Sequence, residues 1–259
     1  MKKKRTPVKM RRGIYILPNL LTTGNLLCGF WAIISVFQER FHFAAVAILL
    51  AAVFDEFDGK VAKLSGTTSK FGMQYDSLAD LVSFGVAPAL LAFSWALRPY
   101  GKFGWLAAFL FVACGAIRLA RYNVLASAGE TKYFKGLPIP VAAAMISFTI
   151  LLYFQLIETD LIKDIVILVM IYVMAFLMVS NIRYFSLKEL NLRKRKPFSI
   201  FIFVVLSLVV IVMEPVVVLS AAVLIYVFSG PVGMALAWRK KRALSGKEPL
   251  PQEDRVTRD

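Results

Sequence analysis

D-E-F-D-G-K-V-A-K at residues 55–63 and G-M-Q-Y-D-S-L-A-D at residues 72–80 place four aspartates inside otherwise apolar sequence. They form two pairs, Asp55 with Asp58 and Asp76 with Asp80. Residues three or four apart project from one face of a helix, so each pair is predicted to share a face. The stretch S-G-T-T-S at 65–69 is typical of a turn. We therefore predict a helical hairpin across which Asp58 faces Asp76.

The surroundings of these aspartates predict a bound metal. A carboxylate near bilayer depth costs a few kcal/mol, and such residues usually face a bundle interior or a water-filled cavity. One aspartate alone is more often a helix cap or a surface charge, but four at this spacing are poorly explained in that way. Oxygen ligands suit Mg²⁺ or Mn²⁺, and the segment holds no histidine or cysteine that would indicate zinc.

The rest of the chain has the composition of an integral membrane protein. Of its 259 residues 59% are hydrophobic, and the mean hydropathy is +0.69. Apolar stretches of roughly spanning length lie at 17–37, 43–64, 72–97, 103–125, 138–157, 161–182, 199–213 and 216–238. The seventh is short, and the Met213-Glu214-Pro215 that follows it fits either a tight turn between two spans or a kink within one. The predicted fold is an all-α bundle of about eight transmembrane helices.

Lysine and arginine occupy alternate gaps between these stretches. They cluster in residues 1–12, 60–70, 118–135, 183–196 and 239–259. The opposite gaps hold Arg40, Arg98, Lys102 and Lys163. By the positive-inside rule both termini and the aspartates face the cytoplasm, which agrees with an even number of spans. This distribution excludes nucleic acid as the partner of the +15 net charge and favours the anionic head groups of membrane phospholipids.

Written as a pattern, the hairpin segment is D-x-x-D-G-x-x-A-K-x8-G-x-x-x-D-x-x-x-D. It resembles the signature of the CDP-alcohol phosphatidyltransferases, membrane enzymes that displace CMP from a CDP-linked lipid or alcohol. One position departs from that signature, since Lys63 stands where the family usually has arginine. Lysine keeps the charge but lacks the bidentate fork that grips a phosphate.

Four further stretches resemble the phosphatidylserine synthase branch of this family. They are P-N-L-L-T-T-G-N-L-L-C-G at 18–29, S-L-A-D-L-V-S-F-G-V-A-P-A at 77–89, R-L-A-R-Y-N at 118–123 and F-K-G-L-P-I-P at 134–140. The resemblance implies transfer of the phosphatidyl group of CDP-diacylglycerol to L-serine, with release of CMP. The last hundred or so residues carry only apolar stretches and basic loops, without an assignable motif.

The resemblance also implies roles for individual residues. The metal ligands would be Asp55, Asp58, Asp76 and Asp80, with Asp80 also the general base for the incoming hydroxyl. The CDP-lipid would be bound by Gly59, Ala62, Lys63 and Gly72. Small residues let a backbone approach a ligand closely, although helix packing is the alternative explanation for them. Two Mg²⁺ or Mn²⁺ ions per site are expected, because two metals can neutralise a pyrophosphate and align the reacting groups.

A serine acceptor also needs a cation for its carboxylate. The candidates lie at the cytoplasmic ends of two predicted helices and are Arg118, Arg121 and Lys135, with Asn123 as an uncharged hydrogen-bonding residue. The alternative for each cation is ordinary anchoring at the membrane surface. Arg118 is the one least explained by anchoring, because it lies inside an apolar run.

Other functions stay open on the sequence alone. A sister enzyme would use glycerol 3-phosphate, inositol or another alcohol as acceptor. A metal-ion or lipid transporter would use the same carboxylates for permeation, but transporters often have interrupted helices in matching halves, and here the acidic residues lie in one hairpin. The oligomeric state is undetermined, with a homodimer as one alternative.

The predicted organisation has five segments. These are a basic cytoplasmic N-terminus at 1–16, a six-helix catalytic membrane core at 17–185, a basic cytoplasmic loop at 186–198, two C-terminal spans at 199–238 and a basic, disordered tail at 239–259. The expected location is the bacterial or archaeal plasma membrane, with the aspartates on the cytoplasmic side.

Overall fold

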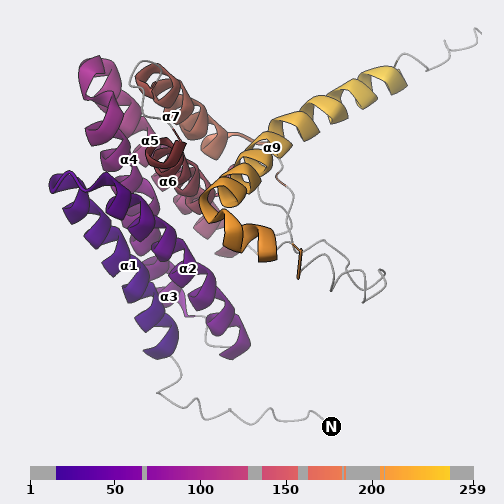
Figure 1. Ribbon diagram of the computed structural model, residues 1–259. Coiled ribbons are helices and arrows are strands. Elements are labelled where there is room, and N and C mark those ends of the chain that lie inside the picture. The colour runs from indigo at the N-terminus through magenta and orange to yellow at the C-terminus, as the bar shows by residue number, and fades with distance from the viewer. Residues whose placement is uncertain are drawn as a thin grey trace, which may run out of the picture.

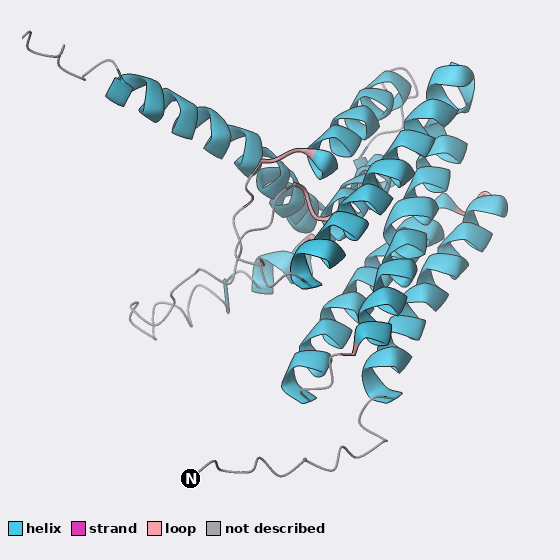
Figure 2. Ribbon diagram, turned by 180° about the vertical axis from the view of Figure 1, so that it is seen from behind, coloured by secondary structure: helices cyan, strands magenta, loops and turns pink. Residues whose placement is uncertain are grey.

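In the computed structural model, the described part of the chain consists of helices joined by short connections, and Figure 2 shows no strand among those residues. The described residues are 16–65, 69–127, 136–156, 163–182, 184, 205–206 and 208–245. The separate helices are α1 (Ile16–Phe37), α2 (Phe41–Ser65), α5 (Lys102–Ser127), α6 (Ile139–Leu156), α7 (Lys163–Val179) and α9 (Pro215–Ser245). Between α2 and α5 lies a composite helix over Lys70–Tyr100. The predicted all-α fold is therefore confirmed.

The composite helix Lys70–Tyr100 changes its winding along its length. It comprises α3 (Lys70–Asp80), a π-helical stretch (Leu81–Val86), α4 (Ala87–Ala92), a second π-helical stretch (Phe93–Leu97) and a final 3₁₀ turn (Arg98–Tyr100). Ser69 caps its start by accepting a hydrogen bond from the Gly72 N–H at 2.9 Å. Pro88 lacks an N–H, and directly before it the Ala87 N–H donates to the Val82 carbonyl five residues back. Wide turns of this kind often occur at functional sites.

Helices α1, α2 and α3 lie side by side at one edge of the bundle (Figure 1). Small side chains allow the close approach of α1 and α2, because Ala32, Ala44 and Ala45 are fully buried. The connection between them is short, and Glu39 takes a positive φ of 58° there. This packing brings the C-terminal part of α2 and the start of α3 against the N-terminal half of α1.

Helix α9 begins against α6, and its C-terminal part extends away from the bundle (Figures 1 and 2). A bend at Glu214 precedes it, and residues 208–213 before the bend are helical. The Glu214 N–H donates to the Val210 carbonyl at 3.2 Å, and the Val218 N–H donates to the Glu214 carbonyl at 3.1 Å. Helical hydrogen bonds therefore continue on both sides, which agrees with a kink and not with a tight turn.

The helix boundaries mostly follow the predicted apolar stretches, and the largest difference is at the C-terminus. Helix α9 continues through Arg239 to Ser245, although the span was predicted to end at residue 238. Alanine, leucine, lysine and arginine are strong helix formers, so the helix continues into basic sequence. The predicted loop at 186–198, residues 1–15 and the chain after Ser245 lie outside the described residues.

Several helices have the length and apolar surface of membrane spans. Four qualify on length and composition among the described residues: Leu17–Phe37, Lys70–Tyr100, Lys102–Leu125 and Pro215–Leu236. Two shorter apolar helices cover Ile139–Gln155 and Ile165–Val179. Large apolar side chains such as Phe37 and Phe176 are 75% and 80% exposed, as expected for groups that face lipid. The chain is thus an integral membrane protein by its helices, and the count of eight spans stays a prediction.

The orientation in the membrane can be tested with reporter fusions. We expect a cytoplasmic signal from reporters placed after Lys70, Lys135, Lys196 and Lys247. Fusions near His42, Lys102 and Asp160 should report the opposite side. The reason is the uneven distribution of lysine and arginine between alternate gaps.

A non-cytoplasmic signal after Lys70 would contradict the predicted orientation, because it would place the aspartates outside. A discrepancy only after Lys247 would instead correct the number of spans that follow α7. The kink at Glu214 makes that last position the most informative one.

Candidate active site

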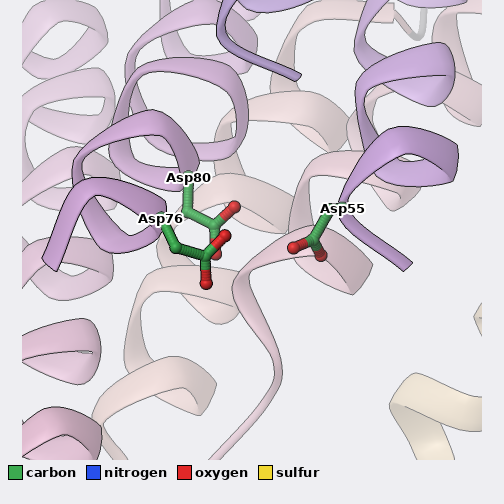
Figure 3. Close-up of side chains that lie close together, drawn as sticks. All are labelled: Asp55, Asp76 and Asp80. Atoms are coloured by element: carbon green, nitrogen blue, oxygen red, sulfur yellow. The ribbon is translucent and has the colours of Figure 1, made fainter. Parts of the chain in front are cut away.

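Three carboxylates converge where α2 meets α3. Asp55 comes from α2, and Asp76 and Asp80 come from successive turns of α3. Each offers one oxygen, and these oxygens lie within 4.8 Å of one another. Figure 3 shows Asp76 and Asp80 projecting from one helix, with Asp55 opposite them on another. We call Asp55, Asp76 and Asp80 the acidic triad.

The donor chemistry of the acidic triad suits a divalent cation. All three groups are carboxylates, the oxygen ligands that Mg²⁺ and Mn²⁺ prefer. Within the described part of the chain, the ion pair that forms nearby joins Lys60 to Glu56 at 3.1 Å and includes no member of the triad. Three carboxylates at this separation repel one another strongly unless a cation compensates them.

Asp58 lies beside the acidic triad, within range of its charges, but outside the tight cluster. Its side chain is 5% exposed, and its Oδ2 accepts a hydrogen bond from the Thr22 hydroxyl at 2.9 Å. Asp58 and Asp76 lie close enough for their charges to interact, as predicted, but Asp55 and not Asp58 completes the tight cluster with the two aspartates of α3. The reason is helical geometry, because three residues leave two side chains about 60° apart around a helix. Asp55 points toward α3, and Asp58 points toward α1.

Asp80 is the most enclosed member of the triad, with 8% of its surface exposed. Its Oδ1 accepts a hydrogen bond from the Nδ2 of Asn25 on α1 at 3.0 Å. Thr22 and Asn25 are thus two hydrogen-bond donors that reach the aspartates from α1. Neither residue was predicted to have a role, although both lie within the N-terminal stretch at 18–29.

A cavity of about 950 Å³ opens beside the acidic triad. Its walls come from four further places in the chain. Helix α5 contributes Arg118, Leu119, Tyr122 and Asn123; the start of α6 contributes Pro138, Ile139, Pro140 and Val141; and α9 contributes Leu219, Ala222, Val223 and Tyr226. The fourth is Phe148, further along α6. A cavity of this size accommodates a small-molecule ligand.

The predicted acceptor residues separate into two groups. Arg118 and Asn123 line the cavity, and the Asn123 Nδ2 donates to the Ser77 hydroxyl at 2.8 Å. Arg121 projects elsewhere, and its Nη2 donates to the Asn181 side chain at 2.7 Å. Lys135 lies outside the described residues. Only Arg118 and Asn123 are therefore placed beside the acidic triad.

The Arg118 side chain is poorly satisfied within the protein. Among the described residues, its buried Nε has no hydrogen-bond partner. A buried guanidinium nitrogen without an acceptor is unfavourable, and an anionic ligand in the cavity would remove that cost. The structure thus provides a cation with unused donor capacity beside the triad.

The small residues predicted to contact a nucleotide lie near the acidic triad but outside the described cavity lining. A Cβ on Gly59 would meet nothing within 4 Å, so space beside α2 is open there. Gly72 lies in the first turn of α3, where a Cβ would come within 3.1 Å of the Ser69 hydroxyl. Ala62 is half-buried on α2, and the Lys63 side chain lies outside the described residues.

The contribution of α9 had no signal in the sequence. Its cavity-lining residues are apolar apart from the Tyr226 phenol. The Tyr226 ring stacks on Tyr184 at 5.6 Å between centroids, and the Tyr184 hydroxyl donates to the Val227 carbonyl at 3.3 Å. Gly230 leaves room for the Tyr184 ring, which a Cβ there would overlap. One tyrosine in a long apolar helix forms no pattern, so only the packing identifies this wall.

Comparison with known proteins agrees with this arrangement. Residues 15–182 match the family described as CDP-alcohol phosphatidyltransferase. The chain is 35% identical over 219 residues to the CDP-diacylglycerol–serine O-phosphatidyltransferase of Helicobacter pylori, covering 84% of this chain and 90% of that protein. It is 40% identical over 136 residues to the Bacillus subtilis protein of that name, covering 51% and 76%.

An archaeal relative extends the comparison. Over 133 residues the chain is 44% identical to the archaetidylserine synthase of Methanothermobacter thermautotrophicus, covering 51% of this chain and 56% of that protein. The family match covers the acidic triad and the α1, α5 and α6 parts of the site, and it ends before α9. The chain belongs to the CDP-alcohol phosphatidyltransferase family.

Proposed function

We propose that this protein transfers the phosphatidyl group of CDP-diacylglycerol to L-serine, releasing CMP and forming phosphatidylserine. The observation that carries the proposal is the acidic triad beside a cavity that holds Arg118. A reaction between an anionic pyrophosphate and an amino acid needs both features. Relatives named for transfer to serine support this choice of acceptor.

The reaction forms one phosphorus–oxygen bond and breaks another. The serine hydroxyl attacks the phosphorus that carries diacylglycerol, and CMP leaves with the electron pair of its bond to that phosphorus. The hydroxyl proton passes to the Asp80 carboxylate, the enclosed member of the triad. Arg118 and Asn123 hold the serine carboxylate, with Lys135 as a further candidate. Together these groups align the acceptor with the leaving group.

The acidic triad would hold the metal, with Asp58 as the neighbouring carboxylate of the same predicted set. We infer two Mg²⁺ or Mn²⁺ ions per site, whose chemistry when bound is to neutralise the pyrophosphate charge. Gly59, Ala62 and Gly72 leave backbone accessible to the cytidine and pyrophosphate, and the Lys63 ammonium adds charge there. The fatty chains of the lipid stay among the apolar helix surfaces.

We also propose how the chain is divided into segments and in which membrane the protein lies. The catalytic core is at 17–185, followed by the basic loop at 186–198 and C-terminal helices from 199 that complete the bundle. The site faces the cytoplasm of a bacterial or archaeal plasma membrane, since lysine and arginine cluster in the gaps on that side. Basic loops bind the anionic lipid surface.

An assay of CMP release tests the acceptor. Membranes that carry the protein, given CDP-diacylglycerol and Mg²⁺ or Mn²⁺, should release CMP with L-serine and much less with glycerol 3-phosphate or inositol. The reason is that Arg118 and Asn123 offer one cation and one amide, which suits a carboxylate better than a phosphate dianion.

Membranes with the Asp76→Asn variant provide the matched background. Faster CMP release with glycerol 3-phosphate or inositol than with serine would contradict serine as the acceptor while keeping the family. Absence of CMP release with every alcohol, at all metal concentrations, would contradict the enzymatic proposal itself.

A further inference from the structure

One stripe of α1 faces the aspartates and differs from its lipid-facing sides. It consists of Thr22, Asn25 and Gly29, which lie on one face because they are three and four residues apart. Thr22 is 4% exposed and Asn25 is fully buried. We call these three residues the α1 inner stripe. Buried polar side chains in a membrane helix are unfavourable unless they have a partner, so their partners indicate what they do.

The two polar members each bind one aspartate, and the two aspartates lie on different helices. The Thr22 hydroxyl is 2.9 Å from the Asp58 Oδ2 on α2. The Asn25 Nδ2 is 3.0 Å from the Asp80 Oδ1 on α3. One helix therefore supplies a neutral donor to both arms of the acidic hairpin, from the side opposite the cavity.

Gly29 fixes the distance at which these donors operate. A Cβ at this position would lie 2.7 Å from the Ser83 Cα, so α1 and the π-helical stretch touch backbone to backbone. The Ser83 hydroxyl also donates to the Asn25 backbone carbonyl at 3.0 Å. These two contacts, one at Gly29 and one at the Asn25 backbone, set the depth and register of α1 against the composite helix.

Asn25 is a costly residue unless its amide has a specific purpose. No group in the described residues donates to its buried Oδ1, and a buried acceptor without a donor is unfavourable. An apolar side chain at this position would avoid that cost. What only asparagine offers here is the Nδ2 hydrogen bond to Asp80.

We propose that Thr22 and Asn25 are positioning residues, which hold the Asp58 and Asp80 carboxylates in the orientation that binds a divalent cation. The inference rests on the proposed function only for the presence of metal at the acidic residues. Each bond occupies one carboxylate oxygen, restricts rotation of the group and leaves its other oxygen for the cation. Partners of this kind behind metal ligands typically change metal affinity by ~10 to 100-fold when removed.

The test measures metal binding directly. Purified protein in detergent is titrated with Mn²⁺, and free Mn²⁺ is followed by electron paramagnetic resonance. Thr22→Val removes the hydroxyl at constant shape, Thr22→Ser retains it, and Asn25→Ala removes the amide. Ser35→Ala is the matched control, because Ser35 is buried on α1 and its hydroxyl donates to the Trp31 carbonyl of the same helix.

We expect the Mn²⁺ dissociation constant to rise by ~10 to 100-fold in Thr22→Val and Asn25→Ala, and to stay at the wild-type value in Thr22→Ser and Ser35→Ala. The melting temperature without metal reports any purely structural loss. Wild-type Mn²⁺ affinity in both Thr22→Val and Asn25→Ala would overturn the inference, whatever their melting temperatures.

The remaining outcomes are also decisive. If Asn25→Ala does not fold, the comparison of Thr22→Val with Thr22→Ser decides, and equal affinities in that pair overturn the inference. A wild-type protein that binds no Mn²⁺ would overturn the metal assignment of the proposed function, and this inference with it. Binding by the wild type and equal binding by the variants would overturn this inference alone.

Discussion

Asp80→Asn is expected to lower turnover by ~100 to 10,000-fold while the protein still binds the CDP-lipid, because the change removes the proposed general base. The substitution keeps a side-chain oxygen for the Asn25 hydrogen bond, so the packing of α1 on α3 should survive. Turnover is measured as CMP release at saturating serine and CDP-diacylglycerol over a wide range of Mg²⁺ and Mn²⁺ concentrations. Lipid binding is measured separately on the purified protein.

Asp76→Asn is the comparison that separates a base from a ligand. Asp76 lies one helical turn from Asp80 and shares the acidic triad, but no proton transfer is assigned to it. Its loss should raise the metal concentration needed for half-maximal rate and should be partly recovered at high metal. If both variants lose the same activity and both need far more metal, Asp80 is chiefly a ligand and another group takes the proton.

Arg118→Ala should raise the KM for serine by roughly 30- to 4,000-fold, with little change in the KM for CDP-diacylglycerol. That range corresponds to the about 2 to 5 kcal/mol associated with removing one partner of a buried charge pair. The physical basis is the buried Nε, which has no acceptor among the described residues and lies beside the cavity. Initial rates of CMP release with each substrate varied in turn give both KM values.

Two comparisons make the Arg118 experiment specific. Serine esters lack the carboxylate charge, so they should be poor acceptors for the native enzyme and should lose less when Arg118 is replaced. Arg121→Ala should have the smaller effect, because that guanidinium is bonded to Asn181. A KM for serine that stays at the wild-type value in Arg118→Ala would end the assignment. An equal rise in the KM for both substrates would indicate that Arg118 binds the pyrophosphate of the CDP-lipid together with Lys63.

Much of the fold could be predicted because membrane helices are long apolar runs separated by basic gaps. The predicted stretch at 103–125, for example, corresponds to α5 over Lys102–Ser127. Hydropathy reports neither the hydrogen-bond pattern within a helix nor the direction of a helix relative to the bundle. It therefore could not predict the π-helical stretch at Leu81–Val86 or the course of α9. Those features depend on Pro88 and on side-chain packing between distant helices.

The site was predictable to the extent that it is local in sequence. The helical spacing of the aspartates placed them near one another, but it could not decide whether Asp55 or Asp58 completes the acidic triad with the two aspartates of α3. That choice depends on the rotation of α2 about its axis, which the Thr22 hydrogen bond to Asp58 accompanies. Arg121 shows the same limit, since it is three residues from Arg118 on one helix yet bonds to Asn181. Tyr226 is more than a hundred residues from the aspartates and has no local signal.

Because α9 forms one wall of the cavity, the residues proposed for catalysis and the residues that shape the cavity lie in different parts of the gene. The residues proposed for bond making lie between Asp55 and Asp80, whereas Ala222 and Tyr226 face the same cavity from a segment beyond the family match. Substitutions in α9 can therefore reshape the space beside Arg118 without altering any carboxylate. Duplicated copies of such a gene have a route to new acceptor alcohols through the C-terminal helix alone, with the inherited chemistry intact. Chimeras that exchange α9 between relatives would retrace that evolutionary route in the laboratory.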